Sequence, residues 1–246
     1  MRRFLVAPEL LGSSTVTIEG KLFRHMVKVL RLHAGEQVIL CNGSGRECTA
    51  TITDIGRQSL TAAIDESLPL TPLESTPRFT LVQGLPKGEK LDLIIQKSTE
   101  LGVAKIVLFP AARSVIKIPA AQAEQRVTRW RAIALEAARQ SGRSSVPDVL
   151  LAESLQAALL SSEDAVKLLL WEDEKHRRIR DLIAGRTTPS GAALLVGPEG
   201  GFDPDEVKLA VDRGFEAVTL GPRILRTETA GLAMLAILQY QWGDVG

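Results

Sequence analysis

The chain of 246 residues is poor in several features that mark specialised classes of protein. It has only two cysteines, Cys41 and Cys48, and two thiols in a chain without an export signal are typically reduced. They flank an expected turn, where pairing across a hairpin is the alternative. No window reaches the ~18 apolar residues that a membrane span needs, and "MRRFLVAPELL" is too short in apolar residues for a signal peptide. A cytoplasmic protein without membrane contact is expected.

Charge imbalance and metal-ligand patterns are also missing. The formal net charge is +1, which argues neither for nor against a polyanionic partner. Three scattered histidines (His25, His33 and His176) lack metal-ligand spacing, so no metal is expected. There is no GxGxxG, no GxSxG, and "GLPKGEK" (84–90) lacks the gap and the final Ser or Thr of a phosphate loop. Dinucleotide binding, nucleotide hydrolysis and serine-hydrolase chemistry are thereby disfavoured.

The first part of the chain, to about residue 66, predicts a small β-rich unit. Short strands are expected at "EQVILCN" (36–42), "ECTATITDI" (47–55) and "SLTAAIDE" (59–66), with turn signals between them at hairpin spacing. Before them, residues 21–31 place Leu22, Met26, Val29 and Leu30 on one face at helical spacing. Several strands closed around one short helix indicate a compact barrel.

The pattern changes after "SLPLTPLESTP" (67–77), whose three prolines indicate a linker. From Arg78 onward, short apolar runs alternate with helical patterns, such as the stripe of Leu91, Ile94 and Ile95 and a long helix at about 120–140. Continuous apolar runs at "KLLLW", "ALLVG" and "AVTLG" are typical of strands that are buried on both faces. Their alternation with helices predicts a parallel α/β sheet.

The loops after the last three of these strands are the candidate site, because ligands of open parallel sheets bind beyond the carboxyl ends of the strands. They begin at Trp171, at "GPEGGFDPDE" (197–206) and at "GPRILRTETA" (221–230). In the second loop, Asp203 is expected to cap a helix that begins at Pro204. The glycines upstream let the backbone approach a ligand and present free amides. The alternative is a plain strand-to-helix turn.

The third loop repeats the Gly-Pro start, which places two sets of backbone groups around one pocket, suited to reading an aromatic or adenine-like ring. The alternative is that its arginines are solvated and Thr227 only caps the last helix. That helix, "TAGLAMLAILQYQW" (229–242), is apolar almost all round. Such a helix indicates packing into a subunit interface as well as onto the sheet.

"GPEGGF" (197–202) followed by "LGPRILRTETA" (220–230) closely resembles the RsmE family, the 16S ribosomal RNA (uracil-N3) methyltransferases of the SPOUT superfamily. "MRRFLV", "HMVKVLR" (25–31), "QKSTELGV" (96–103) and "EAARQSGR" (136–143) are similar to further segments of that family and come in the same order. The resemblance therefore covers essentially the whole chain. Position 139 departs from it, because Arg stands where many relatives are expected to carry Glu.

The resemblance implies an α/β fold with a PUA-like RNA-binding β-barrel over residues 1–68, a linker at 69–77, and a parallel-sheet SPOUT methyltransferase domain over 78–246. It also implies a trefoil knot at about 168–235, a homodimer, and S-adenosyl-L-methionine bound in the knot. The implied cofactor-binding residues are Leu170, Trp171, Glu172, Gly197, Pro198, Glu199, Gly200, Gly201, Leu220, Gly221, Arg223, Ile224, Leu225 and Thr227.

The implied reaction moves a methyl group from a sulfonium to N3 of uracil, in uridine 1498 of 16S rRNA on the small ribosomal subunit. Because N3 carries a proton near neutral pH, a base must remove it or a cation must stabilise the uracil anion. Arg226 is the catalytic candidate for the second role, and Glu228 for orienting it; the alternative is an ion pair that only holds the loop. The competing functions are methylation of another RNA site and a non-catalytic rRNA-binding assembly factor.

RNA contact requires basic surface, because phosphate neutralisation dominates nucleic-acid affinity. Residues 113–143 carry seven basic residues against two glutamates, and further basic residues cluster near the N-terminus and after the first strand of the α/β part. Together they predict a split RNA-binding surface, although a solvated helix face is the alternative for any single one. The expected RNA-binding residues are Arg2, Arg3, Arg24, His25, Arg31, Lys87, Lys90, Arg113, Arg139 and Arg143.

Overall fold

The computed structural model describes residues 1–65, 74, 77–116 and 118–246. By its contacts the chain divides into two compact units. The N-terminal unit comprises Met1–Glu74 with Ala138–Val146, and the C-terminal unit comprises Ser75–Ala137 with Pro147–Gly246. The expected linker at 69–77 falls almost entirely outside the described residues.

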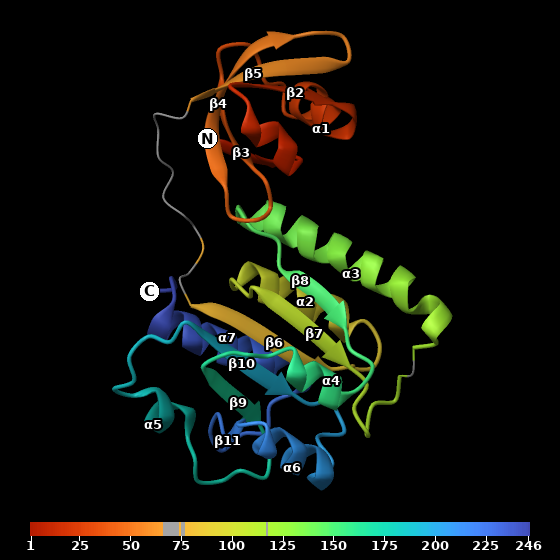
Figure 1. Ribbon diagram of the computed structural model, residues 1–246, viewed down its shortest axis with the longest axis vertical. Helices are drawn as coiled ribbons and strands as arrows, with labels where there is room; N and C mark the ends of the chain where they lie inside the picture. Colours follow the sequence, from red (N-terminus) through yellow and green to blue (C-terminus); the bar gives the residue numbers. More distant parts are fainter. Residues whose placement is uncertain (66–73, 75–76, 117) are drawn as a thin grey trace. The chain divides into compact units, whose positions relative to one another are not determined.

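The N-terminal unit is built on one curled, five-stranded sheet (Figure 1). Its strands are β1 (Arg2–Leu5), β2 (Thr15–Glu19), β3 (Gln37–Cys41), β4 (Glu47–Ile55) and β5 (Ser59–Asp65). The order is β1-β3-β4-β5-β2; β1 runs parallel to β3 and the other pairs are antiparallel. The three predicted strands are confirmed as β3, β4 and β5. The sequence patterns missed β1 and β2, of which β1 is only four residues long and begins with two arginines.

The predicted helix at 21–31 is only partly right. A 3-10 turn, η1 (Pro8–Gly12), comes first, and the helix itself consists of α1 (Gly20–Arg24) followed by a π-helical turn, η2 (His25–Val29). The Leu30 amide donates to His25 O, five residues back, at 2.9 Å. This wider turn changes the side-chain register. Val29, expected on the buried face, is therefore 66% exposed, whereas Phe23 and Met26 lie in the core.

Cys41 and Cys48 are not joined by a disulfide and lie on opposite faces of the N-terminal sheet. Cys41 pairs across the β3–β4 ladder with Glu47, the neighbour of Cys48 on β4. Because successive side chains of a strand point to opposite faces, the two sulfurs are separated by the sheet. Burial, helped by the nearby Glu47 charge and opposed by Arg3 and Arg139, raises the pKa of Cys41 to about 11. The geometry therefore disfavours a hairpin disulfide.

The C-terminal unit confirms the predicted parallel α/β sheet (Figure 1). Its strands are β6 (Arg78–Gly84), β7 (Lys105–Phe109), β8 (Asp148–Leu151), β9 (Val166–Leu170), β10 (Gly191–Val196) and β11 (Glu216–Val218). They stand in the order β11-β9-β10-β6-β7-β8, and every neighbouring pair is parallel. The helices are α2 (Lys90–Glu100), α3 (Ala120–Ser141), α4 (Leu155–Leu160), α5 (Ile179–Ile183), α6 (Pro204–Asp212) and α7 (Thr227–Trp242).

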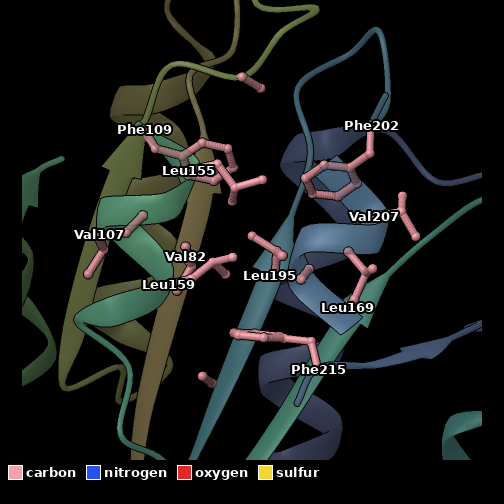
Figure 2. Packing of buried hydrophobic residues seen from close by; sticks show 14 of the residues in the cluster. Val82, Val107, Phe109, Leu155, Leu159, Leu169, Leu195, Phe202, Val207 and Phe215 are labelled. Carbon is pink, nitrogen blue, oxygen red and sulfur yellow. The ribbon is translucent and has the colours of Figure 1, made fainter. Parts of the chain in front are cut away.

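Helices cover both faces of this sheet. On one face, side chains of the strands pack against α4 and α6 in a core that includes Val82, Leu195, Leu159, Phe202 and Phe215 (Figure 2). On the other face, α7 contacts β10, β6 and α2. Burial on both faces explains why the strands are almost continuously apolar. Among the described residues, no helix is long and apolar enough to cross a membrane.

The strand order reverses direction in the middle of the sheet. From β6 the chain moves outward to β7 and β8, then returns to build β9, β10 and β11 on the other side of β6. Loops at the carboxyl ends of strands diverge at such a reversal and leave a crevice between them. The three loops singled out in the sequence therefore lie on the same edge of the sheet.

Candidate functional site

A cavity of about 1240 Å³ opens at the carboxyl ends of β9, β10 and β11. We call it the loop cavity, because the loops after these three strands form its wall, together with Lys90 of α2. All residues that the resemblance implied as cofactor-binding line it, namely those at 170–172, 197–201, 220, 221, 223–225 and 227. Arg226 lines it as well, whereas Glu228 lies behind the wall, in contact with Lys90.

The loop after β10 requires glycine at its narrowest points. Gly201 has a φ of +68°, and a Cβ there would collide with the carboxylate of Glu172. A Cβ on Gly200 would lie only 3.0 Å from the Cβ of Arg113. Gly200 is therefore packed closely against Arg113, and at Gly201 the Glu172 side chain, which lines the cavity, occupies the space that a Cβ would need.

The helix after this loop begins as the sequence predicted. The Asp203 carboxylate accepts a hydrogen bond from the Asp205 amide at 3.2 Å, and Glu206 accepts one from the Asp203 amide at 3.0 Å. This capping box fixes the start of α6. The other oxygen of Glu206 accepts a hydrogen bond from the Ala112 amide at 2.8 Å. The backbone downstream of the glycines is therefore held firmly in place.

A buried hydrogen-bond cluster joins three segments beneath the cavity. The Thr227 hydroxyl donates to Gly197 O at 2.6 Å and accepts from Gln83 Nε2 at 3.0 Å. Gln83, which is fully buried, also donates to Gly84 O at 2.9 Å. Thr227 therefore does not cap α7, whose N-cap residue is Arg226 with no side-chain cap. Its hydroxyl instead ties the start of α7 to the loop after β10 and to the end of β6.

Lys90 bridges two carboxylates that come from different loops. Its Nζ lies 2.9 Å from Glu199 Oε1 and 3.3 Å from Glu228 Oε2. The hydrogen bond to Glu199 is the main reason that the pKa of Lys90 is raised. Burial acts to raise the pKa of Glu199, but hydrogen bonds from Lys90 and from backbone amides outweigh it, so that pKa is lowered. Both groups are thus charged at neutral pH.

Arg226 is left largely unengaged by its expected partner. Its Nη1 lies 3.9 Å from Glu228 Oε1, and its side chain is 82% exposed, whereas that of Glu228 is 14% exposed. Glu228 lies closer to Lys90 than to Arg226. The guanidinium of Arg226 is therefore free to turn toward a ligand in the cavity.

Seven of the expected RNA-binding residues lie in the N-terminal unit. Five are exposed: Arg2, Arg24, His25, Arg31 and Arg139. The other two form internal ion pairs. Arg3 pairs with Glu47 at 2.9 Å, and Arg143, only 7% exposed, pairs with Glu74 at 2.6 Å. The charge of Arg3 and Arg143 is thus balanced within the unit.

The other three expected RNA-binding residues belong to the C-terminal unit. Lys87 is exposed, and its amide donates to the Glu199 carboxylate at 3.0 Å. Arg113 donates to Gly200 O at 3.2 Å and lies 3.7 Å from Asp203. Lys90 is held by its two carboxylates. Of these three cations, Lys87 has the least engaged side chain.

Several residues of the cavity wall were not predicted from the sequence. The loop after β9 and the start of α5 contribute Lys175, Arg178, Ile179 and Arg180. This loop lacks the glycines that drew attention to the other two, and only its first residues were considered. The strand-end rule applied to the whole stretch would have found them. Gln83 was also missed, because a single glutamine in an apolar strand gives no pattern.

The lining of the cavity suits an organic ligand with an aromatic ring. It combines main-chain groups of the Gly-Pro loops with apolar side chains such as Leu170, Val196 and Leu225. Apolar walls with a few polar groups are typical of small-molecule sites. Among residues 1–65, 74, 77–116 and 118–246, no group of three or more His, Cys, Asp or Glu side chains is arranged to hold a metal ion.

The parallel α/β sheet that carries this cavity lies within an RNA methyltransferase domain, and the β-rich unit contains the PUA domain of that class. Residues 74–239 match the family model described as "RNA methyltransferase domain", and residues 18–65 match "RNA methyltransferase PUA domain". The chain belongs to this family and, within it, to the ribosomal RNA small subunit methyltransferase E (RsmE) proteins.

Relatives of that name align over most of their length. The chain is 37% identical over 238 residues to ribosomal RNA small subunit methyltransferase E of Bacillus subtilis, covering 92% of this chain and 90% of the relative. The relative of the same name from Mycobacterium bovis is 34% identical, with 93% and 88% covered. A crystal structure of the Neisseria gonorrhoeae protein of that name, bound to S-adenosyl methionine, superposes with a TM-score of 0.83 at 35% identity and 100% coverage of both chains.

Proposed function

We propose that the protein methylates N3 of uridine 1498 in 16S rRNA of the small ribosomal subunit, with S-adenosyl-L-methionine as the methyl donor. The observation that carries the proposal is the loop cavity, where the two Gly-Pro loops and the end of β9 surround one space. A relative that is similar over its whole length was solved bound to that cofactor. The family's name assigns the relatives to small-subunit ribosomal RNA.

The residues of the cavity fit this cofactor. Main-chain groups at 197–201 and 220–225 are available to an adenine ring and a ribose. The cluster of Thr227, Gln83 and Gly197 holds the two Gly-Pro loops at a fixed spacing. When bound, the cofactor supplies a methyl group on a sulfonium, which is a good leaving group.

The residues of the chain have to deal with the proton on N3. We assign Arg226 the role of stabilising the negative charge that uracil acquires when N3 loses its proton, because the arginine is always charged and faces the cavity. Glu228, held by Lys90, fixes the first turn of α7 next to that arginine. The alternative, in which Arg226 and Glu228 only hold the loop, predicts effects on cofactor affinity rather than on turnover.

Transfer of a radiolabelled methyl group to small subunits that lack this modification tests the reaction. The expected product carries one methyl at N3 of uridine 1498, located by mapping the modified base. A methyl at another position would assign the enzyme to a different RNA site. Cofactor binding without any transfer would favour a non-catalytic assembly factor.

Substitution of Arg226 tests its role in that reaction. Loss of one charge-stabilising donor from an active site typically lowers kcat about 10²–10³-fold. We expect a loss of this size for Arg226→Ala, with unchanged cofactor affinity. Glu228→Gln serves as the comparison. It keeps the shape of a side chain that does not line the cavity and removes only its charge. Full turnover by Arg226→Ala would remove this residue from the chemistry.

We further propose that α7 forms a homodimer interface. Along one side of this helix, apolar side chains at 232, 233, 236 and 237 are only partly buried, and Tyr240 is 72% exposed. Covering such a face with a second copy removes it from water. Sedimentation should show a dimer that Ile237→Asp dissociates, whereas Val211→Asp, at an exposed valine on α6, leaves it intact. A wild-type monomer at micromolar concentration would refute the interface.

The remaining expectations complete the proposal. We place a PUA-like RNA-binding unit at 1–68, a linker at 69–77, the methyltransferase domain at 78–246 and a knot at about 168–235, in a cytoplasmic protein. Support for the knot comes from Thr219, whose amide and carbonyl bond to Arg177 O and the Ile179 amide at 2.9 and 3.2 Å. After this contact the chain crosses from β11, at the edge of the sheet, to α7, which packs on β10 and β6.

Exposed basic residues of both units are the RNA contacts in this proposal: Arg2, Arg24, His25, Arg31, Arg139 and Lys87. Arg3, Lys90, Arg113 and Arg143, which are engaged in ion pairs, support RNA binding by holding their surroundings in place. Binding that neutralises phosphates weakens steeply as salt rises. A flat salt response of rRNA binding would argue against this basic surface.

A further inference from the structure

The outer wall of the loop cavity is strongly basic. Among the residues that the structure describes, six cations line the cavity, against two carboxylates, those of Glu172 and Glu199. Glu199 is taken by Lys90, which leaves one carboxylate facing five cations. These five come from two segments, 175–180 and 223–226: Lys175, Arg178, Arg180, Arg223 and Arg226. All five are exposed.

The side chains of this basic wall are weakly engaged by the protein. Arg180 lies 3.4 Å from its neighbour Asp181, and Lys175 donates to the main-chain oxygen of Glu172. Within the part of the chain that the structure describes, Arg178 and Arg223 make no side-chain ion pair or hydrogen bond. A wall that carries unneutralised charge beside a cavity attracts an anion.

The cavity is also larger than one small ligand requires. Sites for a single drug-sized molecule typically enclose about 300–1,000 Å³, whereas this cavity measures about 1240 Å³. Its buried lining residues include apolar side chains and glycine, such as Val196, Gly197 and Val218, whereas its cations at 175–180 and 223–226 are exposed. These two kinds of lining therefore suit two ligands of different chemistry.

We propose that the cations of 175–180, with Arg223, bind the phosphodiester groups on either side of the target nucleotide. This inference rests on the proposed function and specifies how that site receives RNA. A guanidinium binds phosphate oxygens with two parallel hydrogen bonds, so Arg178 and Arg223 position the strand while the base enters the cavity. The wall thus binds the sugar-phosphate backbone of single-stranded RNA, independently of base identity.

Neighbouring arginines provide a matched test. Arg178 lines the cavity, whereas Arg177 does not and lies 3.8 Å from Glu216. We compare Arg178→Gln, Arg223→Gln and Arg177→Gln in the full-length protein. The measurements are the dissociation constant for small subunits without cofactor over a range of salt concentrations, the KM for subunits, and the dissociation constant for S-adenosyl-L-methionine.

Arg178→Gln and Arg223→Gln should each raise the KM and the dissociation constant for subunits about 3- to 10-fold, and each should lower the salt slope by about 0.7, the value per phosphate contact on single strands. Cofactor affinity should stay unchanged, because the cofactor is proposed to contact main-chain groups at 220–225 and not the Arg223 side chain. Unchanged affinity also shows that the variants fold. Arg177→Gln should match wild type in all three.

Two results would overturn the inference. If the variants lose cofactor affinity while the subunit values stay the same, the cations bind the carboxylate of the cofactor instead. If Arg177→Gln weakens subunit binding as much as Arg178→Gln, the effect belongs to general surface charge. Failure of the proposed function looks different, because the wild-type protein itself would then transfer no methyl group, while the binding measurement still reports on the wall.

Discussion

Replacing Thr227 with valine removes one hydroxyl and preserves the shape of the side chain. That hydroxyl joins the start of α7 to Gly197 O at 2.6 Å and to Gln83 Nε2 at 3.0 Å. Thr227 is 6% exposed and Gln83 is fully buried, so water cannot replace these bonds. The substitution therefore tests whether this cluster holds the Gly-Pro loops in position.

The expected loss follows from the two bonds. A buried hydrogen bond contributes about 0.5–1.5 kcal/mol net, so losing both costs about 1–3 kcal/mol in the free energy of unfolding. Gly197 O keeps a second donor, Gln83 Nε2 at 3.3 Å, which limits the loss. For a unit of this size, each kcal/mol lowers the melting temperature by about 2–4 °C, so a shift on the order of 5 °C is expected.

Cofactor affinity should fall together with stability, because the same loops line the cavity. If cofactor binding must supply about 1 kcal/mol to order loops that the cluster no longer holds, the dissociation constant rises about fivefold. Calorimetric titration and thermal melting measure the two effects. Thr227→Ser, which restores the hydroxyl, should recover most of both losses.

Thr229→Val is the matched control, on the exposed side of the same helical turn. Its hydroxyl makes no hydrogen bond with the described residues. If Thr227→Val behaves like Thr229→Val in both assays, the buried cluster does not hold the loops and the reasoning is wrong. A double-mutant cycle of Thr227→Val with Gln83→Leu measures how much of the effect comes from the hydrogen bond between Gln83 and Thr227.

Three further predictions follow from the site and the N-terminal sheet. Gly201→Ala should weaken cofactor binding and cost about 1–2 kcal/mol or more of stability, whereas Gly214→Ala, with φ +85° and nothing within 4 Å, carries only the backbone strain; equal effects would show that Glu172 accepts the added Cβ. Iodoacetamide at pH 8 should modify Cys48 before Cys41, and equal labelling rates by mass spectrometry would contradict this order. The raised pKa of Cys41 also contributes stability below pH 9.0, which is lost as the pH rises through about 11. The lowered pKa of Glu199 contributes stability above pH 4.5, its ordinary pKa, and this stability is lost as the pH falls through the lowered pKa. Lys90→Met should therefore make the free energy of unfolding depend less on pH in this range. An unchanged pH profile would exclude the pairing.

The strands of this protein could be predicted where apolar runs and turn signals are strong. β4 matches its predicted range of 47–55, and the capped start of α6 at Pro204 was equally clear. Short elements such as β1 and β8 were missed, because four residues carry little pattern and these strands exist through pairing with β3 and β7. The π-helical turn at His25–Val29 could not be predicted either. The apolar residues keep an ordinary helical spacing along the sequence, although the wider turn changes which of them are buried.

The candidate site divides in the same way. The sequence by itself determined where the cavity lies, because glycine, proline and the strand-end rule are local signals that survive without coordinates. Only the tertiary structure decided the partners of its charged and polar groups. It paired Lys90 with two glutamates, buried Arg143 against Glu74, and joined Gln83 to Thr227. These contacts link residues far apart in the chain, and no local pattern records which charges will meet.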